Sequence, residues 1–337
     1  MAMLWSKASR IAVMAASGIG DALMATPLIK AIKQCKPNGR LVVIASETTQ
    51  SIFWNNQDVD KIYVMPSGNR SIIKYVKFVA LLYCEKIEFL FAAQPANVIK
   101  CALTTILGGA KIRLKHEYDY GNQPERNFDF VYHRCLPDNM ARHRVELNLD
   151  FLRYLGEKIP ERSLLPQFYT GKEAIEFIKN RLRNEWTAHQ GNMIAFHAGG
   201  VRPNKRWDIQ NYAAVGKSLI GKGYKIVLVG GRDEIQTNLQ IKEMVNHPDC
   251  INFASQLSLE ETAAILKQSK LLISNDTGIM HLATAVDVPV IAIFGPTDYR
   301  HIGPYGKIGK VIINKTDIKS VSIDQVNNEI EIFLNLN

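Results

Sequence analysis

The sequence predicts an α/β fold made of two doubly wound domains, each with a parallel sheet covered by helices. Its 337 residues exceed the usual size of one domain and suffice for two hydrophobic cores. In both halves, short apolar runs with the length of buried parallel strands alternate with helical patterns. Residues 157–171 contain two prolines and are predicted to link the halves. We therefore predict an N-terminal domain over residues 1–160, a C-terminal domain over 161–320 and a final helix within 321–337.

The first half opens with the strand, helix and strand order of a doubly wound domain. Its predicted strands are Arg10–Ala15, Leu41–Ala45, Ile62–Val64, Phe89–Ala92 and Lys111–Leu114. A helix is predicted from about Asp21 to Lys36, and another from about Val145 to Leu155 that ends at Gly156. Strands that alternate with helices in this way favour a parallel sheet.

The second half repeats this alternation. Its predicted strands are Met193–Phe196, Lys225–Val229, Leu271–Ile273 and Val288–Phe294. A last amphipathic segment, at about 322–334, could pack against either domain, and periodicity alone does not decide between them.

Composition favours a soluble globular protein. Hydrophobic residues make up 47% of the chain and charged residues 22%. No apolar run reaches the length of a membrane span, and the first seven residues are too few and too polar for a signal peptide, so we expect a cytoplasmic protein. The five cysteines lack any CxxC pairing, so we expect reduced thiols and no metal site.

The net charge of +9 predicts an acidic partner, which could be nucleic acid, a phosphorylated glycan or an anionic membrane surface. Nucleic acid is not expected, because no helix-turn-helix, zinc-finger or RNP-type motif accompanies the basic residues. The first half contains two basic clusters, at residues 111–116 and 142–144. These clusters either bind phosphate groups or form a solvated basic surface.

The segment after the strand Leu271–Ile273 predicts an anion site. Asp276, Thr277 and Gly278 lie on the turn into a helix, where exposed amides favour a diphosphate. His281 follows one helical turn later and can face the same ligand. The turn 295–297, at the end of the next strand, completes a crevice at the same sheet edge. The alternative is ordinary helix capping by Asp276 or Thr277.

The turn after the first strand carries an acid directly after its two glycines, as Ser17-Gly18-Ile19-Gly20-Asp21. It lacks the third glycine of a dinucleotide fingerprint and the lysine of a P-loop, and a carboxylate would repel phosphate. A general base suits this position better. The alternative for Asp21 is an N-cap of a helix beginning near Ala22.

Together these motifs resemble glycosyltransferase family 9, the ADP-heptose:lipopolysaccharide heptosyltransferases. The resemblance covers nearly the whole chain and includes, in order, Ser17–Asp21 with Thr26-Pro27, His197–Gly200, Lys205–Trp207, Val229–Glu234, Asp276–Ala283 and Phe294–Thr297. It implies the GT-B architecture, two Rossmann-like domains facing a central cleft, and a final helix that packs back on the N-terminal domain.

The resemblance also implies a function: inverting, metal-independent transfer of heptose from ADP-heptose to a lipopolysaccharide core or related surface glycan, with no cofactor. It implies Asp21 as the base and Lys205 as the cation that stabilises the departing diphosphate. The implied donor-binding residues are His197, Gly199, Gly200, Lys205, Arg206, Glu234, Asp276, Thr277, Gly278 and His281. The expected acceptor-binding residues are Gly18, Gly20, Lys111, Arg113, Lys115, Arg142 and Arg144.

Other functions remain open from the sequence. A sugar-nucleotide epimerase would use the same architecture without an acceptor channel, and a noncatalytic nucleotide- or glycan-binding protein would not need Asp21. An apolar stripe with interspersed lysines indicates either peripheral contact with the inner membrane or a helix that faces the core. The stripe contains Ile72, Ile73, Val76, Val79, Ala80 and Tyr83, with Lys74 and Lys77 between them.

Overall fold

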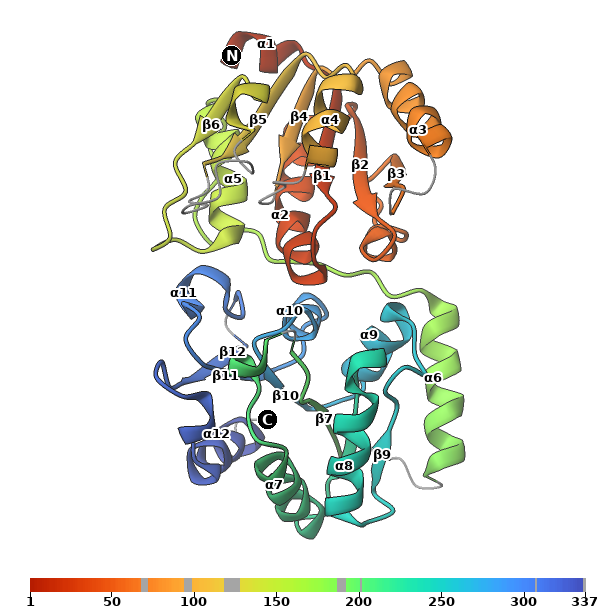
Figure 1. Ribbon diagram of the computed structural model, residues 1–337, viewed down its shortest axis with the longest axis vertical. Helices are drawn as coiled ribbons and strands as arrows, with labels where there is room; N and C mark the ends of the chain where they lie inside the picture. The colour runs from red at the N-terminus through yellow and green to blue at the C-terminus, as the bar shows by residue number, and fades with distance from the viewer. Residues whose placement is uncertain are drawn as a thin grey trace. The chain divides into compact units, whose positions relative to one another are not determined.

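The computed structural model describes residues 1–67, 72–93, 99–117, 128–186, 192–200, 202–306 and 308–335. The chain forms two compact units, Met1–Gln167 and Phe168–Asn337, which are seen in Figure 1. The boundary between them falls inside the predicted linker and after the predicted domain boundary at residue 160. Among the described residues, no helix combines the length and the apolar character needed to cross a membrane.

The first unit is a parallel six-stranded sheet in the order β3-β2-β1-β4-β5-β6, covered by helices. The strands are β1 (Arg10–Ala15), β2 (Arg40–Ser46), β3 (Lys61–Met65), β4 (Phe89–Ala92), β5 (Ile112–His116) and β6 (Arg134–Leu136). The helices are α1 (Ala2–Lys7), α2 (Ile19–Cys35), α3 (Ile72–Cys84), α4 (Ile99–Leu107) and α5 (Arg144–Tyr154), with 3-10 turns at Gln50–Ile52 and Asp129–Val131. The five predicted strands are confirmed, and β6 is an additional edge strand.

The second unit is also a parallel six-stranded sheet, in the order β12-β11-β10-β7-β8-β9. The strands are β7 (Met193–His197), β8 (Lys225–Leu228), β9 (Cys250–Asn252), β10 (Leu271–Asn275), β11 (Val290–Phe294) and β12 (Gly309–Ile313). The helices are α6 (Lys172–Glu185), α7 (Ile209–Gly221), α8 (Ile235–Val245), α9 (Leu259–Lys267), α10 (Gly278–Ala285), α11 (Tyr299–Ile302) and α12 (Ile323–Asn335), with 3-10 turns η4 (Pro203–Lys205), η5 (Arg232–Glu234) and η6 (Ile318–Ser320).

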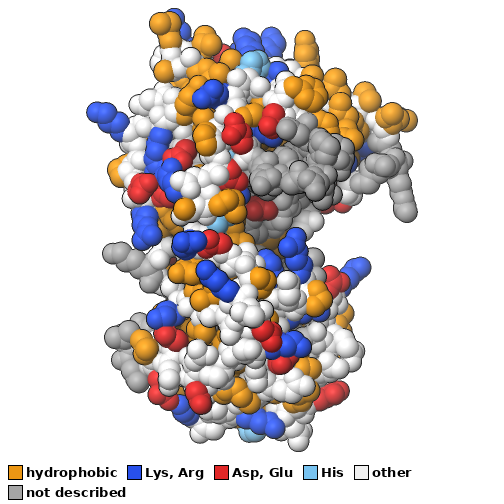
Figure 2. Space-filling view, turned by 60° about the vertical axis from the view of Figure 1, so that its left-hand side comes forward, with side chains coloured by type: hydrophobic (Ala, Val, Ile, Leu, Met, Phe, Trp, Pro, Cys, Tyr) orange, Lys and Arg blue, Asp and Glu red, His pale blue; other side chains and the backbone are white. Residues whose placement is uncertain are grey.

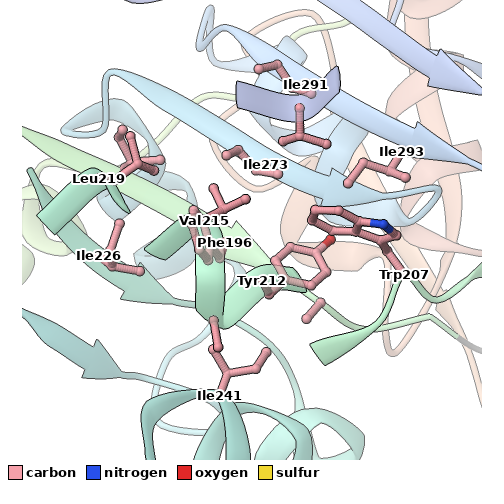
Figure 3. Close-up of a cluster of buried hydrophobic side chains, with 14 of the residues drawn as sticks. Phe196, Trp207, Tyr212, Val215, Leu219, Ile226, Ile241, Ile273, Ile291 and Ile293 are labelled. Carbon is pink, nitrogen blue, oxygen red and sulfur yellow. The ribbon is translucent and has the colours of Figure 1, made fainter. Parts of the chain in front are cut away.

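Aromatic side chains anchor the core of the second unit. Phe196 from β7, Tyr212 from α7 and Trp207 from the preceding loop lie together in Figure 3. The rings of Trp207 and Tyr212 meet edge to face with centroids 5.2 Å apart, and the Trp207 indole donates a hydrogen bond to the Val321 carbonyl at 2.8 Å. Trp207 therefore packs against the helix that follows it.

The final helix α12 packs on the core of the second unit. That it also packs back on the N-terminal domain, as the resemblance implies, stays a prediction. Its Val326 and Ile330 are buried in the core of the second unit. On its outer side, Glu331 pairs with Lys222, the residue that follows α7, at 2.8 Å. The helix thus closes the face of the sheet formed by β11 and β12.

In both sheets, the topological switch point lies beside a motif predicted from the sequence. In the first sheet, β1 pairs with both β2 and β4. In the second, β7 pairs with both β8 and β10. Ligands of doubly wound folds bind outside the carboxyl ends of the strands at such points, because the connecting loops diverge there. The turn after β1 contains Gly18, and those after β7 and β10 contain Gly199 and Asp276.

Candidate functional site

The predicted donor-binding residues of the second unit gather at the carboxyl ends of β7, β8 and β10. His197 is the last residue of β7 and pairs in register with Ser274 of β10. Asp276 and Thr277 follow β10, and Glu234 ends the 3-10 turn after β8. Residues from distant parts of the second half are thereby brought to one sheet edge, as the sequence predicted.

An ion pair between Lys205 and Asp276 connects two of these turns. The Lys205 Nζ atom lies 2.5 Å from Oδ2 of Asp276, and the exposed fractions of the two side chains are 19% and 6%. Lys205 ends η4, and Asp276 precedes α10. The pair therefore holds a lysine ammonium near the N-terminus of a helix, where a second anion would meet both the cation and the helix dipole.

The N-terminus of α10 provides backbone donors. Its N-cap is Thr277, and no side chain in the described part of the chain caps the helix. Thr277 therefore occupies the N-cap position without a side-chain cap hydrogen bond, and Asp276 lies one residue before that position. Asp276 instead pairs with Lys205, and the Thr277 hydroxyl lies 3.3 Å from that of Ser274. The helix begins at Gly278, so its first turn remains available to an anionic ligand.

His281 lies one turn into α10 and is a buried, neutral imidazole. Burial, followed by the positive charge of Lys205, lowers the pKa of His281 to about 4. Its Nδ1 atom has no hydrogen-bond partner among the described residues. A buried polar atom without a partner is costly, so Nδ1 is suited to bond with a ligand in this site.

The depressed pKa of His281 predicts a loss of stability on acidification. The unfolded histidine takes up a proton near its ordinary pKa of 6.5, whereas the folded one does so only near 4. The free energy of unfolding therefore falls as the pH drops through this window, by up to about 3 kcal/mol in total. Above the window, this group does not change the free energy of unfolding. Urea unfolding across this range should show a flatter pH dependence in His281→Gln than in the wild type. Equal slopes would contradict the assignment, and the exposed His247→Gln serves as control.

His197 is also buried and neutral. Burial lowers the pKa of His197, and its Nδ1 lies 3.1 Å from the Val229 carbonyl oxygen. Because a carbonyl oxygen only accepts, Nδ1 carries the proton and Nε2 is left as an acceptor. His197 thus ties β7 to β8 and presents one acceptor.

Glu234 contacts the turns after both β7 and β8. Its Oε2 accepts a hydrogen bond from the Gly231 amide at 2.8 Å. A Cβ atom placed on Gly199 would lie 2.4 Å from Glu234 Oε1, so the carboxylate lies directly over Gly199. This geometry assigns the inward position to Glu234 and not to the adjacent Asp233.

Replacing Gly199 with alanine should displace the Glu234 carboxylate. The added methyl group would overlap the Cγ, Cδ and Oε1 atoms of Glu234, which must then leave the Gly231 amide. If Glu234 binds the nucleoside ribose, titration calorimetry should show ADP affinity about tenfold lower in Gly199→Ala. Gly221→Ala is a matched control, because its Cβ would meet open space. Unchanged ADP affinity in Gly199→Ala would remove Glu234 from the site.

Arg206 and Gly200 form a second link within this loop. The Arg206 Nε atom donates to the Gly200 carbonyl at 2.6 Å, and Gly200 has a φ of +154° that disfavours residues with a side chain. Arg206 therefore holds the loop that carries Lys205, in addition to its predicted place near the donor.

Asn275 connects the turns after β7 and β10 of the second sheet, and the sequence had not assigned it a role. Its amide nitrogen donates to the carbonyls of Ala198 and Gly199 at 3.0 and 2.9 Å. Its oxygen accepts from the Tyr212 hydroxyl at 3.0 Å and the Trp207 amide at 3.2 Å. The side chain is fully buried, so all of these groups depend on it. The adjacent Asp276 is thereby fixed in position.

Replacing Asn275 with alanine should destabilise the protein by about 3 kcal/mol, because it leaves several buried donors and acceptors unpaired. Chemical denaturation measures the loss. The exposed Asn180→Ala on α6 is the control and should stay within about 0.5 kcal/mol of the wild type. A loss as small as that of the control would show that Asn275 does not organise the site.

Asp21 occupies the first turn of α2 in the first unit. The helix begins at Ile19 with Gly18 as N-cap, so the expectation that Asp21 caps a helix beginning near Ala22 is wrong. The Ser17 hydroxyl donates to Asp21 Oδ2 at 2.8 Å, which orients the carboxylate over the turn. Asp21 is half-buried, and Gly20 lies beside it in the same first turn. A half-buried, oriented carboxylate at a switch point can accept a proton from a ligand.

The predicted acceptor-binding cations do not form one free basic surface. Lys111 is exposed, whereas the others contact neighbours within the first unit. Arg113 donates to the carbonyls of Val131 and Ala110, Lys115 pairs with Asp129, Arg142 with Asp150 and Glu161, and Arg144 with Asp138. Carboxylates therefore offset the charges of Lys115, Arg142 and Arg144, whereas Arg113 is held by backbone carbonyls.

One Asp-x-Asp spacing occurs in the chain, at Asp58 and Asp60. Asp58 pairs with Lys30 at 3.5 Å, and Asp60 pairs with Lys33 at 2.9 Å and accepts from the Leu41 amide. Their carboxylates therefore serve the packing of the first unit. Within the described residues, no group of three or more His, Cys, Asp or Glu side chains could hold a metal ion.

Two doubly wound units with polar turns at the carboxyl ends of their central strands form the architecture that the sequence predicted for a nucleotide-sugar-dependent glycosyltransferase. The chain belongs to glycosyltransferase family 9 (heptosyltransferase), whose family model matches residues 92–330. Lipooligosaccharide heptosyltransferase 2 of Haemophilus ducreyi is 24% identical over 319 residues, or 90% of this chain and 88% of that protein.

Solved structures show the same GT-B fold. A family 9 glycosyltransferase from Veillonella parvula superposes with a TM-score of 0.83 at 19% identity, over 98% of each chain. The Escherichia coli heptosyltransferase WaaC with ADP gives a TM-score of 0.76 at 22% identity, over 96% of this chain and 99% of that one.

Proposed function

We propose that this protein transfers a heptose from ADP-heptose to the core of a lipopolysaccharide, with inversion at the anomeric carbon and without a metal ion. The observation that carries this proposal is the Lys205–Asp276 pair at the uncapped N-terminus of α10. The name of the Haemophilus ducreyi relative supports the sugar and acceptor class, and the E. coli structure solved with ADP supports the nucleotide.

The donor diphosphate would bind at the N-terminus of α10. As the glycosidic bond breaks, negative charge grows on the departing ADP, and the Lys205 ammonium and the first-turn amides stabilise it. These groups replace the role that a divalent cation has in other glycosyltransferases. His281 Nδ1 offers a further hydrogen bond, and the Glu234 carboxylate accepts from the ribose hydroxyls.

Asp21 would serve as the general base. The acceptor hydroxyl attacks the anomeric carbon on the side opposite the departing diphosphate, and its proton passes to the Asp21 carboxylate. One bond forms and one breaks at the same carbon, so its configuration inverts. The Ser17 hydrogen bond keeps the carboxylate oriented. The acceptor glycan is expected at the Gly18–Gly20 turn, and the paired cations of the basic clusters are not needed for it.

A thermal-shift panel of ADP, GDP, UDP and CDP, with and without EDTA, tests the donor. A ligand that binds only the folded state raises the melting temperature by mass action. Stabilisation by ADP alone, unchanged by EDTA, is the expected result. Preference for another nucleotide would reject ADP-heptose as donor, and stabilisation that EDTA abolishes would reject the metal-free mechanism.

We further propose that the enzyme works at the cytoplasmic face of the inner membrane.

A further inference from the structure

Helices α3 and α4 of the first unit are apolar on two sides. Their inner sides pack on the core of the unit, with Phe78 and Leu82 from α3 and Cys101 from α4 buried. The Tyr75 hydroxyl joins the two helices through a hydrogen bond of 3.0 Å with Thr104 Oγ1. The inner sides are therefore satisfied, and the outer sides need a separate explanation.

The outer sides of these helices expose a run of large hydrophobic side chains, which we call the α3/α4 face. These residues are 41% to 76% exposed: Ile72, Ile73, Val76, Leu81 and Tyr83 on α3, and Ile99, Leu103, Ile106 and Leu107 on α4. Figure 2 shows hydrophobic side chains gathered on the upper right of the first unit. The alternative that the predicted stripe faces the core is wrong for most of it. A helix that is apolar all round requires a second apolar environment.

The charged residues within helices α3 and α4 are all lysines. The two helices contain three lysines, Lys74, Lys77 and Lys100, and neither contains an aspartate or glutamate. Lys74 and Lys77 are exposed between the apolar side chains. Apolar side chains with interspersed lysines match a bilayer surface with anionic headgroups, because the apolar groups enter the acyl boundary while the ammonium groups meet phosphate. In a two-fold contact between copies, the same lysines would face each other.

We propose that the α3/α4 face docks this protein on an anionic lipid bilayer. The exposed ring of Tyr83 suits the headgroup region, where aromatic residues with a polar end accumulate. Docking brings the enzyme to the surface that holds a lipid-linked acceptor, and in that respect the inference rests on the proposed function. Binding to lipid itself requires neither donor nor acceptor.

Vesicle flotation without substrates tests the docking face. The wild type should bind vesicles of phosphatidylethanolamine and phosphatidylglycerol, and should bind them more tightly than vesicles of phosphatidylcholine. The combined variant Ile73→Ser, Val76→Ser and Leu103→Ser should weaken binding at least about tenfold, because three side chains no longer enter the acyl boundary. Lys74→Ser with Lys77→Ser should remove the preference for anionic lipid, at about fivefold per lysine.

A matched control replaces three exposed hydrophobic residues of the second unit, as Phe177→Ser, Ile235→Ser and Leu239→Ser. These side chains are 39% to 45% exposed, so the control removes similar apolar groups from another surface. Equal loss of binding in both triple variants, or no binding by the wild type, would overturn the proposal. The proposal would also be overturned if the wild type does not bind vesicles but forms a dimer in size-exclusion chromatography that the α3/α4 variant does not form.

Transfer to a soluble acceptor glycan that lacks its lipid separates this proposal from the proposed function. The α3/α4 variant should transfer to that acceptor at the wild-type rate, whereas its transfer to an acceptor embedded in vesicles should fall in proportion to vesicle binding. Absence of transfer in the wild type would count against the proposed function and leave the vesicle result intact. An equal fall with both acceptors would assign the face a role in folding or catalysis and reject docking.

Discussion

Replacing Asp21 with asparagine should lower the transfer rate about a thousandfold while ADP binding stays unchanged. Asparagine retains the shape and can still accept the hydrogen bond from the Ser17 hydroxyl, but it cannot take the acceptor proton. General-base catalysis typically contributes about 10²- to 10⁴-fold to a rate, so its loss should dominate kcat. The proposed ADP site consists of residues of the second unit, so the affinity for ADP should not change. Steady-state kinetics with titration calorimetry measures both quantities.

A neighbouring acid provides the control for this variant. Asp58→Asn removes a carboxylate of the same unit that pairs with Lys30, and it should leave kcat within about a factor of two. Transfer by Asp21→Asn at the wild-type rate would show that another group removes the proton. A parallel loss of ADP affinity would show that Asp21 acts through the donor and not as the base.

Replacing Lys205 with alanine should lower kcat by about 10²- to 10³-fold and also weaken ADP binding. The variant loses the ammonium to which we assign the stabilisation of the departing diphosphate. It also leaves the Asp276 carboxylate, 6% exposed, without its partner and next to the bound phosphates. The double variant Lys205→Ala with Asp276→Asn should recover part of the ADP affinity but little of kcat, because it removes the repulsion without restoring the cation.

The melting temperature of each Lys205 variant distinguishes lost chemistry from lost folding. Lys222→Ala is the control, since it removes an exposed lysine that pairs with Glu331 on the outer side of α12. A Lys205→Ala enzyme with wild-type kcat would contradict the assigned role. Failure of the double variant to recover any ADP affinity would place Asp276 away from the diphosphate.

The central strands of both sheets were predictable, because buried parallel strands are continuous apolar runs. The strands absent from the sequence prediction, β6, β9 and β12, all lie at sheet edges. An edge strand has a neighbouring strand on one side only, so it tolerates charged residues, such as Arg134 in β6 and Lys310 in β12. Their short and mixed sequences therefore carry little periodic signal.

The position of Asp276 was predictable, because it lies on the turn between a buried strand and a helix. The site was not predictable where distant partners decide it. Asn275 has no motif of its own, and its role comes from bonds to the loop after β7 and to Tyr212. Likewise, Arg144 is a cation in the sequence, but its charge is compensated by Asp138 in the fold. A count of basic residues cannot show such pairing.

Incubation with ADP-heptose and a lipopolysaccharide acceptor that lacks heptose, followed by mass spectrometry of the acceptor, tests the central claim most directly. The proposed function predicts that the acceptor gains one heptosyl residue, that ADP is released in equal amount, and that the new linkage has the inverted anomeric configuration. Conversion of ADP-heptose to another nucleotide-sugar without any gain by the acceptor would instead indicate an epimerase and contradict the proposed transfer.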